Sequence, residues 1–450
     1  MKTYTIAIIF VLFSILARAQ EKTVFTLNDC ISRALAENID LKIQKNHEKN
    51  AMYDRIRSQW QMAPSVNGWG NSSLNLRRST NQDNEITSGS SYNVGYGVSS
   101  HLNLFNGLTQ MNTIAALKYN ELVYKESTEY AFNMLYLQII EQYTTVLYQS
   151  AMVKVLHERL EISKKERDRI QAFINEGRIE PVALYEIEAT VSGNELEHNR
   201  MENSYKLSLI QLSQLIEWAN YETFAIAPTE FDHIQPKIKP LSYASVYSLA
   251  CANLPQIRQR EYTIEYLKKT LNISEGKRSP SLSLNAGYSS GFYSTDTLSG
   301  GIPTAFNDQF SKYLNPNLGL SFSIPIFNGF GRSIEVKKSK VDLENGLYEL
   351  ENQKKQIGKE IVEAIQRLEA YRLEFESASN NLKFVEKSFE SYRAKFQLGL
   401  LNSTDFITAQ NQLTQANSNV LGAKYSWIVQ EKIIELYMGN CDFEKGDNEN

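Results

Sequence analysis

Few residues of this chain are spaced in a way that could support chemistry, and the clearest case is a match to a serine-hydrolase motif. The run Gly287-Tyr288-Ser289-Ser290-Gly291 fits Gly-x-Ser-x-Gly, in which the serine attacks an acyl carbon from a tight turn between a strand and a helix. That geometry needs a helix directly after the serine, whereas a loop rich in Ser, Thr and Gly is expected here. The match is therefore interpreted as a coincidence.

The other residues that commonly act in catalysis or bind metals are scattered. The chain has five histidines but no His-Glu-x-x-His, and it has no Gly-x-x-x-x-Gly-Lys loop that could hold a phosphate. Most carboxylates fall in Glu/Lys-rich helical text such as residues 158–168, which is typical of solvated helix faces with i,i+4 ion pairs. These patterns predict no catalytic residue, no cofactor and no metal site.

Charge and cysteine content are those of an exported protein. Residues 1–19 are predicted to be a signal peptide, because Lys2 precedes an apolar run and residues 17–19 read Ala-Arg-Ala, a small-x-small cleavage site. Without Lys2 and Arg18, 45 basic residues face 51 acidic ones, and a net charge of about −6 argues against nucleic-acid binding. The cysteines have no metal-binding spacing and are interpreted as incidental thiols: Cys30, Cys251 and Cys441.

Two stretches of the chain, 222 positions apart, have similar sequences. Leu102-Asn103-Leu104-Phe105-Asn106-Gly107 corresponds to Ile324-Pro325-Ile326-Phe327-Asn328-Gly329, and a second glycine follows each after 70 proline-free residues, at Gly177 and Gly399. As a helix, each interval would be roughly 105 Å long. The sequence therefore predicts two internal repeats, 20–220 and 241–440, joined by a linker at 221–240 and followed by a polar tail at 441–450.

Each repeat is predicted to contain one strand hairpin, at 64–105 and 280–327. Apolar residues alternate there with Asn, Gly, Ser and His, and polar loops at 77–91 and 289–313 separate the paired strands. The polar face would suit a wet lumen and the apolar face lipid. The candidate lipid-facing positions are Tyr92, Val94, Tyr96, Val98, Leu102, Leu104, Leu318, Leu320, Phe322, Ile324 and Ile326. A soluble sheet packed on the chain's own helices is the alternative.

Four strands cannot close a barrel, so strands of several protomers would have to share one, since open edges are not tolerated in lipid.

The remaining segments of the sequence are predicted to be helical. Segments 27–60 and 241–277 are predicted to open the repeats, and residues 368–396 carry apolar side chains at spacings of 3 and 4, as in helices packed in a coiled coil. Arg167, Asn194 and His198 interrupt the corresponding seam of the first repeat; setting register or touching water is the favoured interpretation over binding by His198.

This order of helix, strand hairpin, long helix, glycine turn and returning helix, duplicated behind a signal peptide, resembles the TolC-like outer-membrane efflux channel family. Its most specific parts are Leu-x-Leu-Phe-x-Gly at 102–107, the related run at 324–329, and Phe-x-x-Gly before an Asp and a Gln/Leu/Ala-rich helix at 396–416. The resemblance implies an α+β membrane protein: a homotrimer whose four strands per chain form a shared transmembrane β-barrel, with a long antiparallel coiled-coil tunnel in the periplasm.

The resemblance also implies partners and sites. A periplasmic adaptor (membrane fusion protein) would dock at the helical tips, at Gly177, Arg178, Gly399 and Leu400, and an inner-membrane pump would supply energy; alternatively, the glycines only reverse the chain. Well-known members have two aspartates lining a periplasmic constriction, and counting from the tip places Asp405 and Thr408 at those positions. Thr408 departs from the pattern. Asp405 could instead be a helix-start residue, with Ser403 or Thr404 as the cap.

The function implied is that of the outer-membrane channel of a tripartite efflux or type I secretion system. A periplasmic coiled-coil adaptor or scaffold is the alternative, although adaptors do not need this duplication. A passive porin would not need two 70-residue rods. The transported substrate, whether drug, metal or protein, does not follow from the sequence.

Overall fold

The computed structural model describes residues 23–80, 86–227, 241–295 and 304–439. The predicted signal peptide, the predicted C-terminal tail with Cys441 and residues 228–240 of the predicted linker lie outside this part of the chain. The chain divides into two compact units. The first contains residues up to Asn46, Glu126–Arg258 and the chain from Asn352; the second contains His47–Lys125 and Gln259–Glu351. Each unit draws on both halves of the sequence.

The core of the first unit forms around a small parallel sheet. Strand β1 (Thr23–Phe25) pairs with β4 (Phe224–Ile226), which follows the short 3-10 helix η1 (Tyr221–Thr223). Helix α2 (Leu27–Glu37) begins with a capping box, in which Thr26 N–H donates to the Asp29 carboxylate and its hydroxyl accepts from Asp29 N–H. The Thr26 N–H and the Thr26 hydroxyl both donate to the Asp29 carboxylate, which lowers the pKa of Asp29. The largest side chains fully buried around this sheet are Ile31, Ile139, Ile140, Tyr143, Leu212, Ile216 and Ile428.

The two predicted opening helices are each broken in two. Residues 27–60 form α2 and α3 (Ile39–Trp60), because Asn38 leaves the helical conformation with ψ 127° and its side-chain carbonyl accepts from Leu41 N–H. The Asn38 amide donates to the Leu215 carbonyl. Residues 241–277 form α6 (Tyr243–Asn253) and α7 (Pro255–Gly276), because Pro255 disfavours a helical conformation at the preceding residue.

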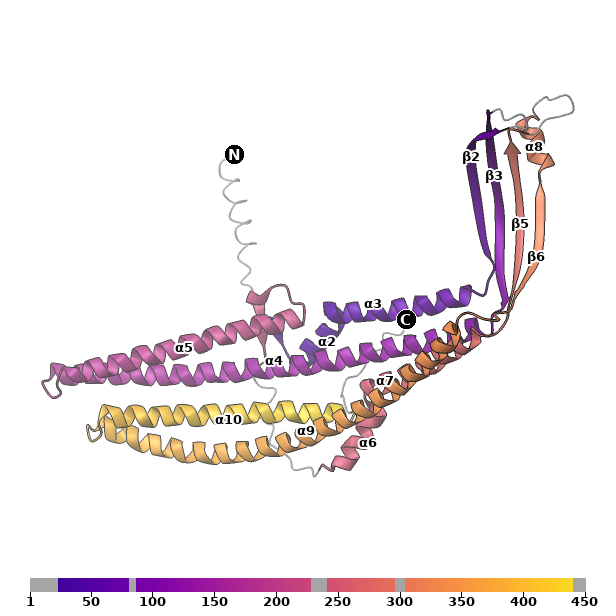
Figure 1. The fold of residues 1–450 in the computed structure, drawn as a ribbon. Helices are drawn as coiled ribbons and strands as arrows, with labels where there is room; N and C mark the ends of the chain where they lie inside the picture. Colours follow the sequence, from indigo (N-terminus) through magenta and orange to yellow (C-terminus); the bar gives the residue numbers. More distant parts are fainter. Residues whose placement is uncertain (1–22, 81–85, 228–240, 296–303, 440–450) are drawn as a thin grey trace, which may run out of the picture. The chain divides into compact units, whose positions relative to one another are not determined.

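The predicted long helices are confirmed. Helices α4 (Thr109–Asn175) and α9 (Gly331–Gln397) have 67 residues each, and α5 (Val182–Leu215) and α10 (Ser403–Tyr437) return after them with 34 and 35 (Figure 1). In the first unit, Gln142 of α4 donates to the Ser208 carbonyl of α5, and Tyr437 of α10 donates to Glu360 of α9. Burial, with Glu360 nearby, raises the pKa of Tyr437. Within the described ranges, no helix is both long and apolar enough to cross a bilayer.

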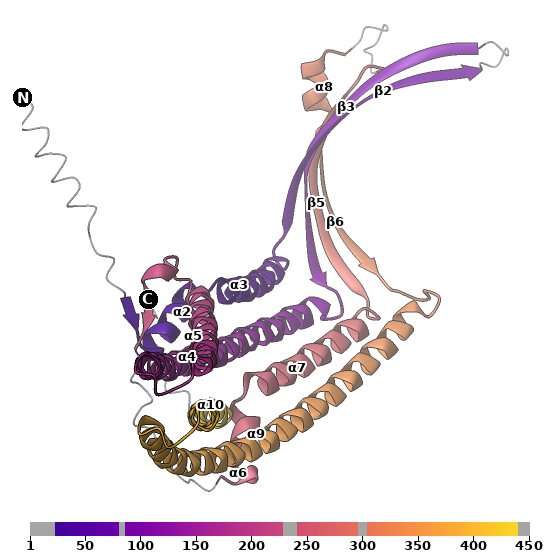
Figure 2. The same cartoon turned by 90° about the vertical axis from the view of Figure 1, so that its left-hand side faces the viewer.

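The second unit contains a four-stranded antiparallel sheet. Its order is β2 (Ser65–Thr80), β3 (Ile86–Phe105), β5 (Ser281–Tyr293) and β6 (Asn315–Ser323), and Figure 2 shows these strands running side by side. The strands extend into both predicted loops: pairing of β2 with β3 continues to Thr80 and Ile86, and β5 continues to Tyr293. The second loop also contains helix α8 (Phe306–Lys312).

The prediction that Ile324 and Ile326 lie in a strand is wrong. Strand β6 ends at Ser323, the partner of Ser281, which is the first residue of β5. Pro325 has no N–H to donate to a neighbouring strand, and Pro280 precedes the partner strand, so the ladder stops here. Ile324 and Ile326 therefore lie in the connection to α9, where Ile326 is 93% exposed.

Candidate functional site: the sheet faces and the helical tips

The register of the sheet collects its apolar side chains on one face. Residues directly opposite each other in an antiparallel ladder share a face. Leu102, Leu284 and Leu320 form one such row, and the even-numbered positions of β2, β5, β6 and of β3 up to Leu102 all belong to this apolar face. Further members of the face include Val66, Leu74, Tyr92, Val98, Leu282, Tyr288, Leu318 and Phe322. The odd-numbered positions make a polar face of Asn, Ser and Gly.

The apolar face is largely open to its surroundings at β6. Leu318, Leu320 and Phe322 are 77, 67 and 65% exposed. Exposed apolar side chains in a continuous row mark a surface that contacts lipid or protein. The alternation predicted from the sequence is thus confirmed as a segregation of two faces over four strands.

Two predicted members of the apolar row differ from the expectation. The register shifts between Asn103 and Phe105, so that Phe105, and not Leu104, pairs with Leu282. Leu104 is the extra residue of this bulge. The Tyr96 ring stacks on Phe310 of α8, with 4.4 Å between ring centroids, so α8 covers this end of the face.

The two helical tips have the same backbone structure. Gly177 and Gly399 both have φ of +73°. After α4, Arg178 N–H donates to the Phe173 carbonyl and Gly177 N–H to that of Ile174; after α9, Leu400 and Gly399 donate to Lys395 and Phe396 in the same way. This is the Schellman arrangement, which needs a left-handed residue after the helix. A glycine serves here because of its φ, since a Cβ would meet no atom within 4 Å.

Replacing Gly399 with alanine should therefore lower stability by about 1–2 kcal/mol, the cost of a left-handed conformation for an L-residue. The matched control is Gly422→Ala within α10, where φ is ordinary and space is open; this change should raise stability by up to about 1 kcal/mol. Thermal unfolding followed by circular dichroism distinguishes the two. A Gly399→Ala variant as stable as the wild type would contradict the requirement for glycine.

The tips expose apolar side chains and one arginine. Leu398 and Leu400 are 74 and 72% exposed, and Val182 beside the first tip is 57% exposed. The Arg178 guanidinium lies 4.4 Å from the centroid of the Phe173 ring and 3.3 Å from the Glu176 carboxylate. The predicted tip residues are thus brought to two short turns with accessible surface.

Asp405 lies in the first turn of α10, but the cap is neither Ser403 nor Thr404. Asn402 is the N-cap residue: its side-chain oxygen accepts from Asp405 N–H at 2.8 Å, and its amide donates to the Asp405 carboxylate at 2.9 Å. Thr408, one turn on, donates to the Thr404 carbonyl. Both Asp405 and Thr408 are exposed, while Phe406 and Ala409 point into the protein.

An arginine that sequence reasoning missed joins the two hairpins near their tips. Arg169 of α4 donates to the Phe396 carbonyl at 2.9 Å and lies 4.7 Å from the centroid of the Phe396 ring. Its Nε is 2.7 Å from the carboxylate of Glu166, whose side chain is only 5% exposed. Phe396 in turn stacks on Phe406. Arg169 lies in a segment rich in charged residues, which is typical of a solvated helix face. Its contacts with Phe396 become apparent only where α9 packs beside α4.

Asn194, one of the residues that interrupt the apolar seam, is buried in a polar network. Its amide donates to the Ser163 hydroxyl at 2.6 Å, and Ser163 also contacts the Gln410 side chain at 3.4 Å. The Gln410 amide donates to the Arg159 carbonyl. The network connects α5, α4 and α10, as expected of a residue that sets register. His198 is half-buried, with its ring centroid 5.5 Å from that of His157.

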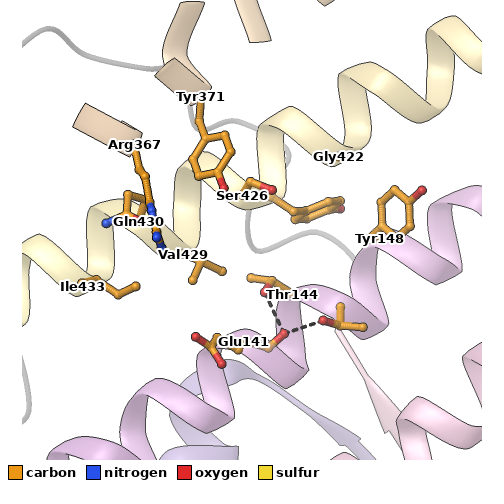
Figure 3. A pocket seen from close by; sticks show the side chains of 12 residues that line it. Glu141, Thr144, Tyr148, Arg367, Tyr371, Gly422, Ser426, Val429, Gln430 and Ile433 are labelled. Atoms are coloured by element: carbon orange, nitrogen blue, oxygen red, sulfur yellow. Dashed lines mark hydrogen bonds between the residues drawn. The ribbon is translucent and has the colours of Figure 1, made fainter. Parts of the chain in front are cut away.

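A hollow of about 550 Å³ is lined by side chains of α4, α9 and α10, and Figure 3 shows it. The hydroxyls of Thr144 and Thr145 both donate to the Glu141 carbonyl within α4, and Arg367 of α9 lies 3.8 Å from Glu363.

In the described part of the chain, no three His, Cys, Asp or Glu side chains are grouped to hold a metal ion. Ser289 of the hydrolase-like motif lies inside β5, with strand on both sides.

Long helical hairpins combined with a four-stranded sheet of two contrasting faces are the features that this chain shares with the proteins found by comparison. Residues 246–440 match the outer membrane efflux protein family. The alkaline protease secretion protein AprF of Pseudomonas aeruginosa is 20% identical over 317 residues, 68% of this chain and 62% of AprF. Outer membrane protein TolC of Escherichia coli is 22% identical over 36% of this chain and 33% of TolC. The chain thus spans less than two thirds of these relatives.

The fold comparison extends over most of the chain. A crystal structure of CusC, described for its transmembrane channel formation, superposes with a TM-score of 0.76 at 17% identity and covers 92% of this chain and 91% of CusC. The chain therefore shares its fold with CusC over most of its length, and residues 246–440 match the outer membrane efflux protein family, in line with the motifs.

Proposed function

We propose that this protein is the outer-membrane channel of a tripartite efflux or type I secretion system. The observation that carries the proposal is the sheet: four paired strands place exposed apolar side chains on one face and uncharged polar ones on the other. Among the residues that the structure describes, its outer strands β2 and β6 each have one neighbouring strand. Strands of three protomers would complete a twelve-stranded barrel, with the apolar face in lipid and the polar face around the lumen.

The two halves of the chain arise, on this proposal, from an internal duplication. The order of two helices, two strands, a long helix and a returning helix occurs twice, and α4 and α9 are equal in length. The helices of the trimer would form the periplasmic tunnel. The protein is not an enzyme on this reading, and an inner-membrane pump supplies the energy.

The lipid-facing set is proposed with the changes that the register requires. It comprises Tyr92, Val94, Val98, Leu102, Phe105, Leu318, Leu320 and Phe322. Tyr96 is left out because α8 covers it, and Leu104, Ile324 and Ile326 because they lie outside the row.

Docking of the periplasmic adaptor is proposed at the two tips, because exposed apolar side chains surround both turns. A cysteine at Arg178 or Leu400 should crosslink to the same partner in whole cells of the native host. Glu363, which lies on α9 far from either tip in sequence and has a side chain 47% exposed, provides the control and should not crosslink. A similar yield from all three positions would remove the reason for assigning docking to the tips.

Asp405 is proposed to form a three-fold acidic constriction at the periplasmic mouth. Reconstituted trimers should conduct in planar bilayers, and they should prefer cations, because three carboxylates near one axis attract them. Asp405→Asn removes the charge but keeps a side-chain acceptor for Asn402, so selectivity should fall toward unity without loss of assembly. Thr408→Asp, one turn away, should raise it. Absence of conductance argues against a channel, whereas unchanged selectivity in both variants argues only against the constriction.

A further inference from the structure

The polar face of the sheet is free of formal charge over most of its length. Within residues 65–75, 91–103, 281–293 and 315–323, no odd-numbered position is Asp, Glu, Lys or Arg. Asn, Ser and Gly dominate these positions. Such a surface offers hydrogen bonds but exerts little long-range attraction on ions.

Two large aromatic side chains, Trp69 of β2 and Tyr293 of β5, lie on this face, and Trp69 is 46% exposed. It stands opposite Gly97 in the ladder of β2 and β3. A Cβ at Gly95 would lie 3.3 Å from the Trp69 ring and 2.6 Å from the Asn71 side-chain oxygen, and a Cβ at Gly287 would lie 2.2 Å from the Asn317 side-chain oxygen. The glycines therefore form a floor over which the indole and two amides extend.

Two recesses lie on this floor, and Trp69 lines both. One has a volume of about 520 Å³ and is also lined by Asn71, Asn93 and Tyr293; Lys312 of α8 lines it too, at 5.3 Å from the Tyr313 ring. The other has a volume of about 300 Å³ and is lined by Asn67, His101 and Asn285. An aromatic ring between two amide-lined hollows is suited to a ligand that repeats along its length.

The second recess contains a row of hydrogen-bonded side chains. The side-chain oxygen of Asn285 lies 2.7 Å from His101 Nδ1, and the Asn285 amide donates to the Ser321 hydroxyl at 3.0 Å. These contacts hold the Asn285 side chain in place. Neighbouring amides such as Asn67 and Asn317 can both donate and accept, which matches hydroxyl groups, since each hydroxyl also does both.

We propose that the polar face carries a binding subsite for a neutral saccharide chain, centred on Trp69. The apolar C–H face of a sugar ring would pack on the indole, and its hydroxyls would bond to the amides on either side. The inference rests on the proposed function, because it makes the subsite a point of contact for substrate in the lumen. It names uncharged, hydroxyl-rich chains as a substrate class.

The test is current block of reconstituted full-length trimers by maltohexaose. Maltohexaose should interrupt the open-channel current, and Trp69→Ala should shorten the blocked dwell time about tenfold, the effect expected for an aromatic stacking contact. Trp69→Phe should retain part of the dwell time. Trp60→Ala, which removes a 73% exposed tryptophan at the end of α3, should leave it unchanged.

Other outcomes overturn the inference. Conductance without any block by maltohexaose does so while leaving the channel function intact, and so does equal block by a hexamer of galacturonic acid or by an uncharged Gly-Ser peptide of similar mass. Equal effects of Trp69→Ala and Trp60→Ala would also do so. If no conductance is seen, tryptophan fluorescence of the purified chain in a detergent without sugar groups decides: a maltohexaose-dependent change lost in Trp69→Ala supports the subsite, and its absence overturns it.

Discussion

Replacing Leu320 with arginine is expected to prevent most of the protein from assembling in the outer membrane. Leu320 lies in a row with Leu284 and Leu102 and is 67% exposed, so an arginine would project from the apolar face. An arginine in lipid costs about 2–4 kcal/mol per chain at mid-depth and less toward the interface, and three copies would be present in a trimer. The measurement is the yield of folded trimers in the outer-membrane fraction, resolved by unheated gel electrophoresis.

The neighbouring residue Ser321 supplies the matched control. It pairs with Ser283 on the polar face of the same strand, so Ser321→Arg adds the same side chain to the opposite side. This variant should assemble close to the wild-type level, because its arginine would reach water in the lumen. Equal yields of the two variants would show that the faces are assigned the wrong way or that the sheet does not meet lipid.

Replacing Arg169 with methionine should destabilise the first unit by about 3–5 kcal/mol, because the change leaves a buried carboxylate without its cation. Glu166 has a side chain only 5% exposed and lies 2.7 Å from Arg169, which also donates to the Phe396 carbonyl. The expected result is a lower unfolding midpoint in urea, together with faster proteolysis near the tips. Methionine is chosen because it retains most of the apolar stem of arginine.

Two further variants make this result specific. Glu166→Gln combined with Arg169→Met should recover part of the stability, since the uncompensated charge is then gone. Lys164→Met removes an exposed ion pair with Glu161 and should cost less than about 1 kcal/mol. A single Arg169→Met variant no less stable than Lys164→Met would contradict a structural role for the buried pair.

The sequence by itself determined the local structure of this protein. Alternation around Leu320 predicted strand, because successive side chains of a strand point to opposite faces, and the register confirmed the segregation. The proline-free intervals predicted the two long helices, and Gly177 and Gly399 end them because both residues have positive φ. These features depend on neighbours within a few residues.

The points where a helix or strand is interrupted were harder to predict. A single Pro or Asn indicates the interruption, whereas the apolar periodicity around it indicates that the element continues. Pro255 could have indicated the break between α6 and α7. Asn38 gave a weaker signal, because its amide finds its partner at Leu215, 177 residues away in sequence. The end of β6 depended on Pro325, which stands at a position where apolar alternation continues to Ile326.

Only the tertiary structure decided which distant side chains meet. Arg169 reads as part of a solvated helix face until α9 brings Phe396 beside it, and Tyr96 reads as lipid-facing until α8 stacks Phe310 on its ring. Trp69 gained its setting in the same way, from Gly95 and Gly97 of the neighbouring strand β3. A period in the sequence specifies which face of an element a residue occupies, whereas the partner of that face depends on how elements far apart in the chain pack together.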